Sequence, residues 1–352
     1  MENKQSGVVL PKPETVPSGG LYHKFLFWLR LSNQYRVKVY RGFGTATSLS
    51  TSGHVLNLSP LSRKHYRKNV LLNLFAVLRL FFVRPVAGVT VRLKDQPNVM
   101  TQTDTDGFFR LDWSPDSPLS AGWHPVIVEL VTQNRGVIAE GEGHVCVPDS
   151  TKYGFISDID DTFLISHSAT ILKRLLVLLT QNARSRRPFE GVVRHYQLLA
   201  EAQTDEQTAN PFFYVSSSEW NLYDYILEFA GQHQLPEGVY QLAQLKRFSQ
   251  ILATGKTRHT TKLDRIARIL LAFPDRQFVL LGDDTQQDPV IYSEIVQHHP
   301  GQIRCVYLRK LNPKNHQNTL ARIAEITAAG IDCCYFDHSA DATDHSRRIG
   351  LI

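Results

Sequence analysis

Hydrophobic and polar residues follow two different patterns along the chain, and the change falls near residue 150. Before it, short runs alternate apolar and polar residues and are separated by turn-forming residues, which is typical of β-strands. The runs that predict strands are 36–44, 54–59, 86–93, 108–113, 124–131 and 136–147. Asp106-Gly107 predicts a hairpin turn rather than a calcium loop, because the further ligand spacing of such a loop is missing. We therefore predict a small β-sandwich-like domain over residues 34–149.

After residue 150, buried apolar runs alternate with longer segments of helical period. The apolar runs end in small or acidic residues, as in 153–162, 212–218, 277–284 and 303–308. The helical segments between them are 169–180, 188–202, 220–233, 261–273 and 288–299. This alternation predicts an α/β domain over residues 150–352, with a parallel sheet and helices on both faces.

Two segments of the first 84 residues stand apart from the strand pattern. Residues 1–33 are rich in Pro, Gly, Ser and basic residues, so we expect a flexible basic tail. Residues 69–83 form an apolar, helix-like stretch inserted in the β-rich region. Its fifteen residues fall short of the roughly 20 that span a bilayer. Both a helix buried in the first domain and an interfacial helix facing a membrane remain open.

The distribution of charge favours an anionic partner for the front of the chain. Residues 1–84 hold 13 Lys and Arg against two acids, whereas the remainder holds 26 basic and 31 acidic residues. Four basic residues precede the apolar stretch: Arg63, Lys64, Arg67 and Lys68. Basic residues beside an apolar helix favour an anionic membrane surface over nucleic acid. Protein partners and oligomeric state are not readable from the sequence.

Composition limits the class of protein. A chain of 352 residues with 42% hydrophobic and 20% charged residues is not disordered and suffices for about two domains. Four cysteines without a C-x-x-C pattern predict neither a disulfide framework nor a zinc knuckle. The start of the sequence shows no apolar signal core. We expect a cytoplasmic protein, with peripheral membrane association as a hypothesis.

Acidic and hydroxyl residues collect where three predicted strands of the second domain end. They are Asp158, Asp160 and Asp161, then Ser216, Ser217 and Ser218, then Asp283, Asp284 and Asp288. Ligands bind outside the carboxyl ends of parallel strands, and carboxylates gathered there repel one another. A hard divalent cation is the natural counter-charge, so the pattern predicts a Mg²⁺ site rather than three helix caps.

The spacing within Asp158-Ile159-Asp160 adds a mechanism. Alternate residues of an extended segment face the same way, so both carboxylates would address the site. One carboxylate can attack phosphorus and form an aspartyl phosphate. The other can protonate the leaving alkoxide and then activate the hydrolytic water.

Three segments of the second domain resemble a known family. YGFISDIDDTF, FFYVSSSEWNLYD and FPDRQFVLLGDDTQQDPVIY are similar, in this order, to the catalytic domain of actin-patch phosphatidate phosphatases. That domain belongs to the haloacid-dehalogenase-like superfamily, and the resemblance spans roughly residues 150–310. The β-rich region also resembles the part that precedes this domain in shorter family members. The resemblance implies a Rossmann-like sheet of the haloacid-dehalogenase type.

The resemblance assigns a role to individual residues. It implies that Asp158 is the nucleophile and a metal ligand, and that Asp160 is the general acid and base and gives the metal a carbonyl. Ser216 and Ser217 would bind the phosphoryl group, and so would Lys262, for which Lys256 is the competing candidate. Asp283 would complete the metal site with Asp288. Asp284 stands where the family more often has a small hydroxyl residue, so either Asp284 or Asp288 is the second acid of this motif.

These inferences predict a Mg²⁺-dependent phosphatase that hydrolyses a phosphomonoester. The resemblance makes phosphatidate the leading substrate and diacylglycerol its product. Two alternatives remain: a soluble phosphomonoesterase for a nucleotide or sugar phosphate, and a membrane- or protein-docking module with vestigial catalysis. The true substrate is not fixed by strand-end acids.

Overall fold

The computed structural model describes four stretches of the chain, which form two compact units. The described residues are 31–60, 79–159, 191–243 and 258–352, apart from 33, 133, 135 and 206. Within them, the first unit ends at Val147 and the second begins at Pro148. No helix in these stretches combines the length and the apolar character needed to cross a membrane.

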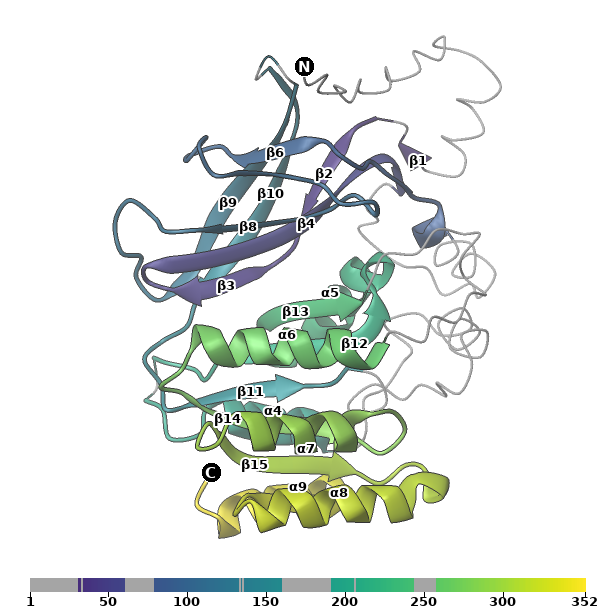
Figure 1. Cartoon of the computed structure of the whole chain (residues 1–352). Helices are drawn as coiled ribbons and strands as arrows, with labels where there is room; N and C mark the ends of the chain where they lie inside the picture. Colours follow the sequence, from purple (N-terminus) through teal and green to yellow (C-terminus); the bar gives the residue numbers. More distant parts are fainter. Residues whose placement is uncertain are drawn as a thin grey trace, which may run out of the picture. The chain divides into compact units, whose positions relative to one another are not determined.

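The described part of the first unit is built from β-strands and one short 3-10 turn. Its strands are β1 (Leu31–Ser32), β2 (Arg36–Val39), β3 (Gly42–Thr45), β4 (Ser48–Pro60), β5 (Arg84–Pro85), β6 (Thr90–Leu93), β7 (Met100–Gln102), β8 (Phe108–Trp113), β9 (Gly122–Val131) and β10 (Val137–Val147). The turn η1 spans Arg79–Phe81. The all-β character that alternation predicts is therefore confirmed (Figure 1).

Hydrogen bonds join these strands into one mixed sheet with a continuous path of pairing. The long strand β4 pairs antiparallel with β1, β2, β3, β5 and β8. Strand β3 then pairs in parallel with β10, and the path continues through β9 and β6 to β7. Side chains from six of the strands meet in one apolar core that includes Val37, Val55, Val91, Phe109, Val128 and Val145.

Two details of the first unit bear on the sequence predictions. Asp104 accepts hydrogen bonds from the backbone N–H groups of Asp106 and Phe108 at 2.9 Å, and Gly107 has a φ of 71°. These contacts confirm a turn between β7 and β8. The predicted hairpin is wrong, however, because β7 pairs with β6 and β8 pairs with β4. Leu31 and Ser32, assigned to the flexible tail, instead pair with Pro60 and Ser59. The rest of that tail and most of the apolar stretch 69–83 lie outside the described residues.

The second unit contains a six-stranded sheet in which all neighbours run parallel. Its strands are β11 (Tyr153–Ser157), β12 (Phe212–Glu219), β13 (Gly238–Ala243), β14 (Gln277–Asp283), β15 (Ile303–Arg309) and β16 (Asp332–Phe336). The strand order is β13-β12-β11-β14-β15-β16. Strand β11 is buried at every position, as expected for the centre of a parallel sheet covered on both faces. The α/β architecture is confirmed.

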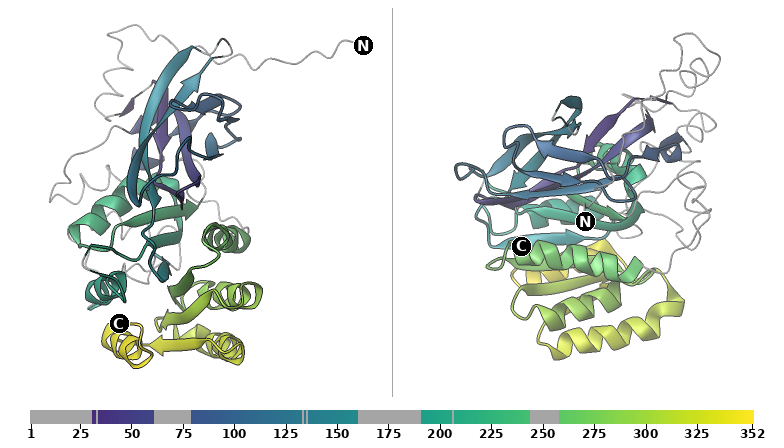
Figure 2. Two further views of the ribbon diagram at one scale, coloured as in Figure 1. Left: turned by 90° about the vertical axis from the view of Figure 1, so that its left-hand side faces the viewer. Right: turned by 45° about the horizontal axis from the view of Figure 1, so that its top comes forward.

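Helices lie on both faces of this sheet (Figures 1 and 2). They are α4 (Val192–Ala200), α5 (Tyr223–Gln232), α6 (Arg258–Ala272), α7 (Asp288–His298), α8 (His316–Ala328) and α9 (Ser339–Arg348), with the short turns η2 (Trp220–Leu222) and η4 (Pro313–Asn315). Helix α6 shows the sequence reason for this packing: Ile266, Ile269 and Leu270 recur at helical spacing and are fully buried. Helix α7 begins with Asp288-Pro289, where proline removes no needed N–H and an acid faces the positive helix end.

Candidate active site

The strand order brings the predicted acidic strand ends to one edge of the sheet. Strand β11 lies between β12 and β14, and Ser157 is in register with Tyr214 and Leu281. The N–H of Asp158 continues this pairing by donating to the Leu281 carbonyl at 2.8 Å. Asp158 therefore follows the central strand β11 directly and lies next to the end of β14, which is Asp283.

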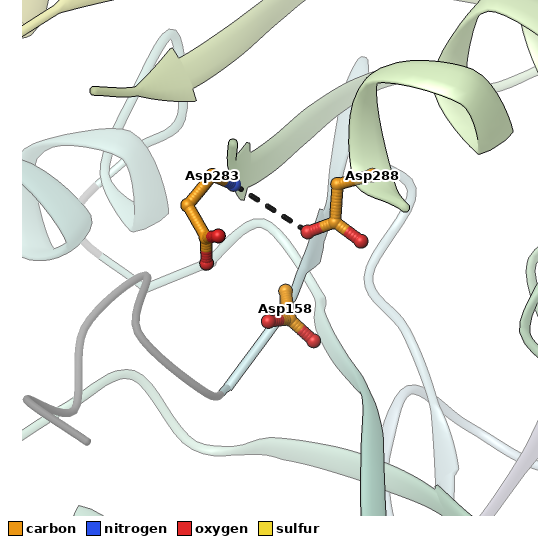
Figure 3. Close-up of side chains that lie close together, drawn as sticks. All are labelled: Asp158, Asp283 and Asp288. Carbon is orange, nitrogen blue, oxygen red and sulfur yellow. Dashed lines mark hydrogen bonds between the residues drawn. The ribbon is translucent and has the colours of Figure 1, made fainter. Parts of the chain in front are cut away.

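Three of the predicted acids form a buried cluster. Oxygen atoms of Asp158, Asp283 and Asp288 lie within 4.8 Å of one another, and all three residues are fully buried. They come from the end of β11, the end of β14 and the start of α7 (Figure 3). The Asp283 N–H also donates to Asp288 Oδ2 at 3.4 Å. The parallel topology thus brings Asp158 into one small volume with two acids that are far from it in the chain.

Lys262 of helix α6 joins the cluster. Its Nζ donates to Asp158 Oδ1 at 2.7 Å and also to Asp288 Oδ1, and the lysine is 2% exposed. Burial by itself would lower the pKa of this ammonium group. The two carboxylates outweigh burial and raise the Lys262 pKa above its usual value, so the lysine is protonated.

Local hydrogen bonds fix Asp283 after the last apolar residue of its strand. The backbone N–H and the hydroxyl of Thr285 both donate to Asp283 Oδ1, at 2.6 and 2.5 Å. Gly282 precedes it, and a Cβ at that position would lie 2.5 Å from Asp288 Oδ2. Only glycine lets α7 approach the strand closely enough for Asp288 to reach the cluster.

Asp284 points away from the acid cluster. Its Oδ1 accepts the backbone N–H groups of Leu311 and Asn312 at 2.7 and 2.8 Å. Its Oδ2 accepts the hydroxyl of Tyr335 at 2.7 Å. Of the two acids between which the sequence leaves the choice, Asp288 lies in the cluster and Asp284 does not. Their catalytic roles stay predictions.

The predicted hydroxyl residues lie at the end of the neighbouring strand β12. Ser216 is fully buried, Ser217 is 9% exposed, and the Ser218 N–H donates to Ser216 Oγ at 2.8 Å. Pairing with β13 is irregular between Val215 and Glu219, so the three serines leave the regular ladder. Their binding of a phosphoryl group stays a prediction.

Sequence reasoning missed Arg265, one helical turn after Lys262. Its Nη1 donates to the carbonyls of Ser216 and Gln241 at 2.9 and 3.1 Å. Burial lowers the pKa of Arg265 to about 10, which still leaves it charged at neutral pH. Helix α6 therefore carries one cation to the acid cluster and a second to the ends of β12 and β13. The i, i+3 spacing of Lys262 and Arg265 is the signal that could have found it.

Two predicted participants lie outside the described residues. Asp160, the predicted general acid and base, directly follows the last described residue of its stretch, Ile159. Lys256, the competitor of Lys262, precedes helix α6. Of the two lysines, the structure describes Lys262 alone.

The cluster has the donor set that a hard divalent cation requires. Three carboxylates and the Lys262 ammonium carry a formal charge of −2 as a group. Buried charge is costly unless it is balanced. Carboxylate oxygens are the ligands that Mg²⁺ prefers, and it commonly binds one or two of them together with water. The residues present therefore fit a Mg²⁺ ion.

Comparisons with known proteins identify the same part of the chain. Residues 153–310 match the family described as phosphatidate phosphatase APP1, catalytic domain. The phosphatidate phosphatase APP1 of Saccharomyces cerevisiae is 29% identical over 160 residues. This match covers 44% of the chain but only 25% of the yeast protein.

Among solved structures, the apo structure of Bacteroides uniformis beta-glucuronidase 3 aligns with 88% of this chain and 38% of its own. Its identity is 8% and its TM-score 0.23, which is too low to indicate a common fold. The range that matches the family model includes the acids of the buried cluster together with Lys262. Residues 153–310 of this chain are therefore similar to the catalytic domains of phosphatidate phosphatases.

Proposed function

We propose that this chain is a Mg²⁺-dependent phosphatase of the haloacid-dehalogenase type that hydrolyses a phosphomonoester through an aspartyl phosphate. The observation that supports it most is the buried group of Asp158, Asp283, Asp288 and Lys262 at the carboxyl edge of the parallel sheet. Such an edge is where open α/β sheets bind ligands. Buried charges of like sign lower the stability of the fold, and groups of this kind cluster at functional sites.

In this proposal, Asp158 acts as the nucleophile. One of its carboxylate oxygens forms a bond to phosphorus, while the bond from phosphorus to the substrate alkoxide breaks. Asp160 gives its proton to the leaving alkoxide and then accepts a proton from the water that hydrolyses the aspartyl phosphate. Both products, an alcohol and inorganic phosphate, are thereby released, and Asp158 is regenerated.

The remaining residues supply charge and orientation. Asp158, Asp283 and Asp288 would hold the Mg²⁺, which neutralises charge between the carboxylate and the phosphate that it must approach. Lys262 orients Asp158 through its 2.7 Å hydrogen bond. Ser216 and Ser217 would donate hydrogen bonds to the phosphoryl oxygens, and Arg265 would hold the Ser216 carbonyl in place.

The leading substrate in this proposal is phosphatidate, with diacylglycerol as the product. The family match of residues 153–310 supports this choice. The 13 basic residues among the first 84 are consistent with a chain that works at an anionic bilayer surface. Peripheral membrane association is therefore part of the proposal.

A phosphate-release assay tests the substrate directly. The full chain with Mg²⁺ is offered phosphatidate in vesicles and, in parallel, soluble nucleotide and sugar phosphates. Faster release from phosphatidate supports the proposal. Release only from the soluble compounds would support the phosphatase reaction but contradict phosphatidate as the substrate. No release from any of the compounds would favour a docking module.

Replacing the nucleophile gives the sharpest test of mechanism. Asp158→Asn keeps the shape of the side chain but removes the attacking oxygen, so we expect turnover to fall by at least roughly 1,000-fold. Asp332→Asn is the matched control, because Asp332 belongs to the same sheet, is 52% exposed in its side chain and pairs with Arg304. Circular dichroism should show both variants folded. Retained turnover in folded Asp158→Asn would disprove the nucleophile assignment.

A further inference from the structure

Asp284 is a buried carboxylate that neighbours a proposed metal ligand without joining the metal cluster. It is 1% exposed, and its two oxygens accept three hydrogen bonds from Leu311, Asn312 and Tyr335. Three donors at 2.7 to 2.8 Å satisfy the oxygens of this buried side chain, which would otherwise be costly to bury. Both oxygens of the side chain are therefore hydrogen-bonded to strand β16 and to the segment that follows strand β15.

The backbone of Asp284 is held by the same segment. Its N–H donates to the Arg309 carbonyl at 3.1 Å, and its own carbonyl accepts from Asn315 Nδ2 at 2.6 Å. Asp283, one residue earlier, is in register with Arg309 across β14 and β15. The N–H, the carbonyl and the side chain of residue 284 are thus all held by hydrogen bonds.

Tyr335 of strand β16 is the partner of Asp284 that comes last in the chain, and it is itself held by neighbours. The His316 ring stacks on it with centroids 5.6 Å apart, and Lys310 Nζ lies 5.0 Å from the ring centroid. Burial and the hydrogen bond to Asp284 raise the pKa of Tyr335, so its hydroxyl is a donor at neutral pH. Residues 311–352, with Tyr335, follow the end of the family match at residue 310.

We propose that Asp284 is a positioning residue for Asp283, and that Tyr335, through Asp284, helps to set the affinity of the Mg²⁺ site. The proposal rests on the metal site of the proposed function. Asp283 is held by the residue after Asp284, since Thr285 donates to it twice. A shift of residue 284 therefore moves both Asp283 and the group that orients its carboxylate. Outer partners of this kind commonly change metal affinity by 10–100-fold when they are removed.

The test removes one hydroxyl group and measures Mg²⁺ binding. Tyr335→Phe keeps the ring that contacts His316 and Lys310 but deletes the donor to Asp284. We expect the Kd for Mg²⁺, measured by calorimetric titration, to rise roughly fivefold to tenfold, at the low end of the effects of such outer partners. The rise in melting temperature on adding Mg²⁺ should shrink accordingly. Asp284→Ala should weaken binding at least as much.

Tyr214→Phe is the matched control. Tyr214 is also buried in this sheet, and its hydroxyl donates to the Pro236 carbonyl at 2.9 Å, away from the acid cluster. Its loss should leave the Kd for Mg²⁺ unchanged, even where it lowers the melting temperature without metal.

The outcomes separate this proposal from the proposed function. If the wild-type chain binds Mg²⁺ and Tyr335→Phe binds it equally well, the positioning role is wrong and the metal site stands. The positioning role is also wrong if Tyr335→Phe merely melts earlier, by the same amount with and without Mg²⁺. If the wild-type chain does not bind Mg²⁺ at all, the metal site of the proposed function is wrong, and the positioning role fails with it.

Discussion

The two units differ in how their buried carboxylates are compensated. In the described part of the first unit, the buried acid Glu129 pairs with Arg92 at 2.7 Å, and buried His54 contacts the Tyr40 hydroxyl at 2.9 Å. Burial lowers the pKa of His54 to about 3, so that side chain is uncharged at neutral pH. The second unit instead buries Asp158, Asp283 and Asp288 against one another.

Unfavourable electrostatic interactions are concentrated at one edge of the second unit. The first unit neutralises what it buries, as expected when folding alone shapes a core. The second unit concentrates like charges at the carboxyl edge of its sheet, where they lower stability unless a cation joins them. Perturbed and mutually repelling groups of this kind gather at functional sites. The contrast in buried charge therefore supports placing the proposed site in the second unit, independently of any relative.

The largest effect is expected at the buried cation of the second unit. Lys262→Met removes the positive charge that Asp158 and Asp288 share, and an uncompensated buried charge costs about 3–5 kcal/mol. Urea unfolding without metal should show this loss, and added Mg²⁺ should restore part of it. Turnover should fall by at least about 100-fold, because Lys262 also orients the nucleophile. Unchanged stability would contradict the electrostatic contrast between the units.

A moderate, pH-dependent effect is expected in the first unit. His54 binds a proton near pH 6.5 when unfolded but only near pH 3 when folded. Acidification through this window therefore favours the unfolded state, and His54 should cost about 1.4 kcal/mol of stability for each pH unit. Urea unfolding at pH 7 and pH 5 should show a loss about 2 kcal/mol smaller in His54→Gln than in the wild type.

His195 allows the pH dependence of stability to be compared between the two units. It is buried in the second unit, and burial lowers its pKa to about 3 as well. His54→Gln should leave the acid sensitivity that comes from His195. Equal pH dependence in the wild type and in His54→Gln would show that His54 titrates normally and would remove this part of the contrast.

The smallest effect is expected for an exposed ion pair of the first unit. Lys94 Nζ lies 3.0 Å from Glu140 Oε2, and both side chains are 43% exposed. Solvent screens such pairs and side-chain entropy opposes them. Lys94→Gln should leave the urea midpoint and the turnover unchanged within error. A loss comparable to that of Lys262→Met would mean that burial does not explain the difference between the two lysines.

Local signals predicted much of the fold. Alternation at 54–59 and 108–113 predicted strands of the first unit, and the Asp106-Gly107 turn formed as its residues require. Apolar runs followed by helical segments predicted the parallel sheet of the second unit. Strand β13 at 238–243 was missed, since its signal is short and lies in a region without clear alternation.

The order in which the strands of the first sheet pair could not be predicted from local sequence patterns either. It depends on β4 pairing with five other strands and on β3 meeting β10 in parallel. Pairings of this kind join residues distant in the chain, and alternation gives each strand a buried face but no partner. The prediction of a β-sandwich-like domain rested on the number of short strands and on the turns between them, and neither specifies which strands pair.

Residue order alone was enough to identify the acids that follow the strands of the second unit. Lys262 lies on helix α6, and it was named only through the family resemblance, with Lys256 as the competing candidate. Which of two adjacent, chemically identical residues joins the acid cluster depends on the tertiary structure. Asp283 and Asp284 are adjacent and identical, yet one faces Asp158 and the other faces Tyr335. The physical reason is that successive residues at a strand end point in different directions, and only the packing of α7, β15 and β16 determines what each carboxylate meets.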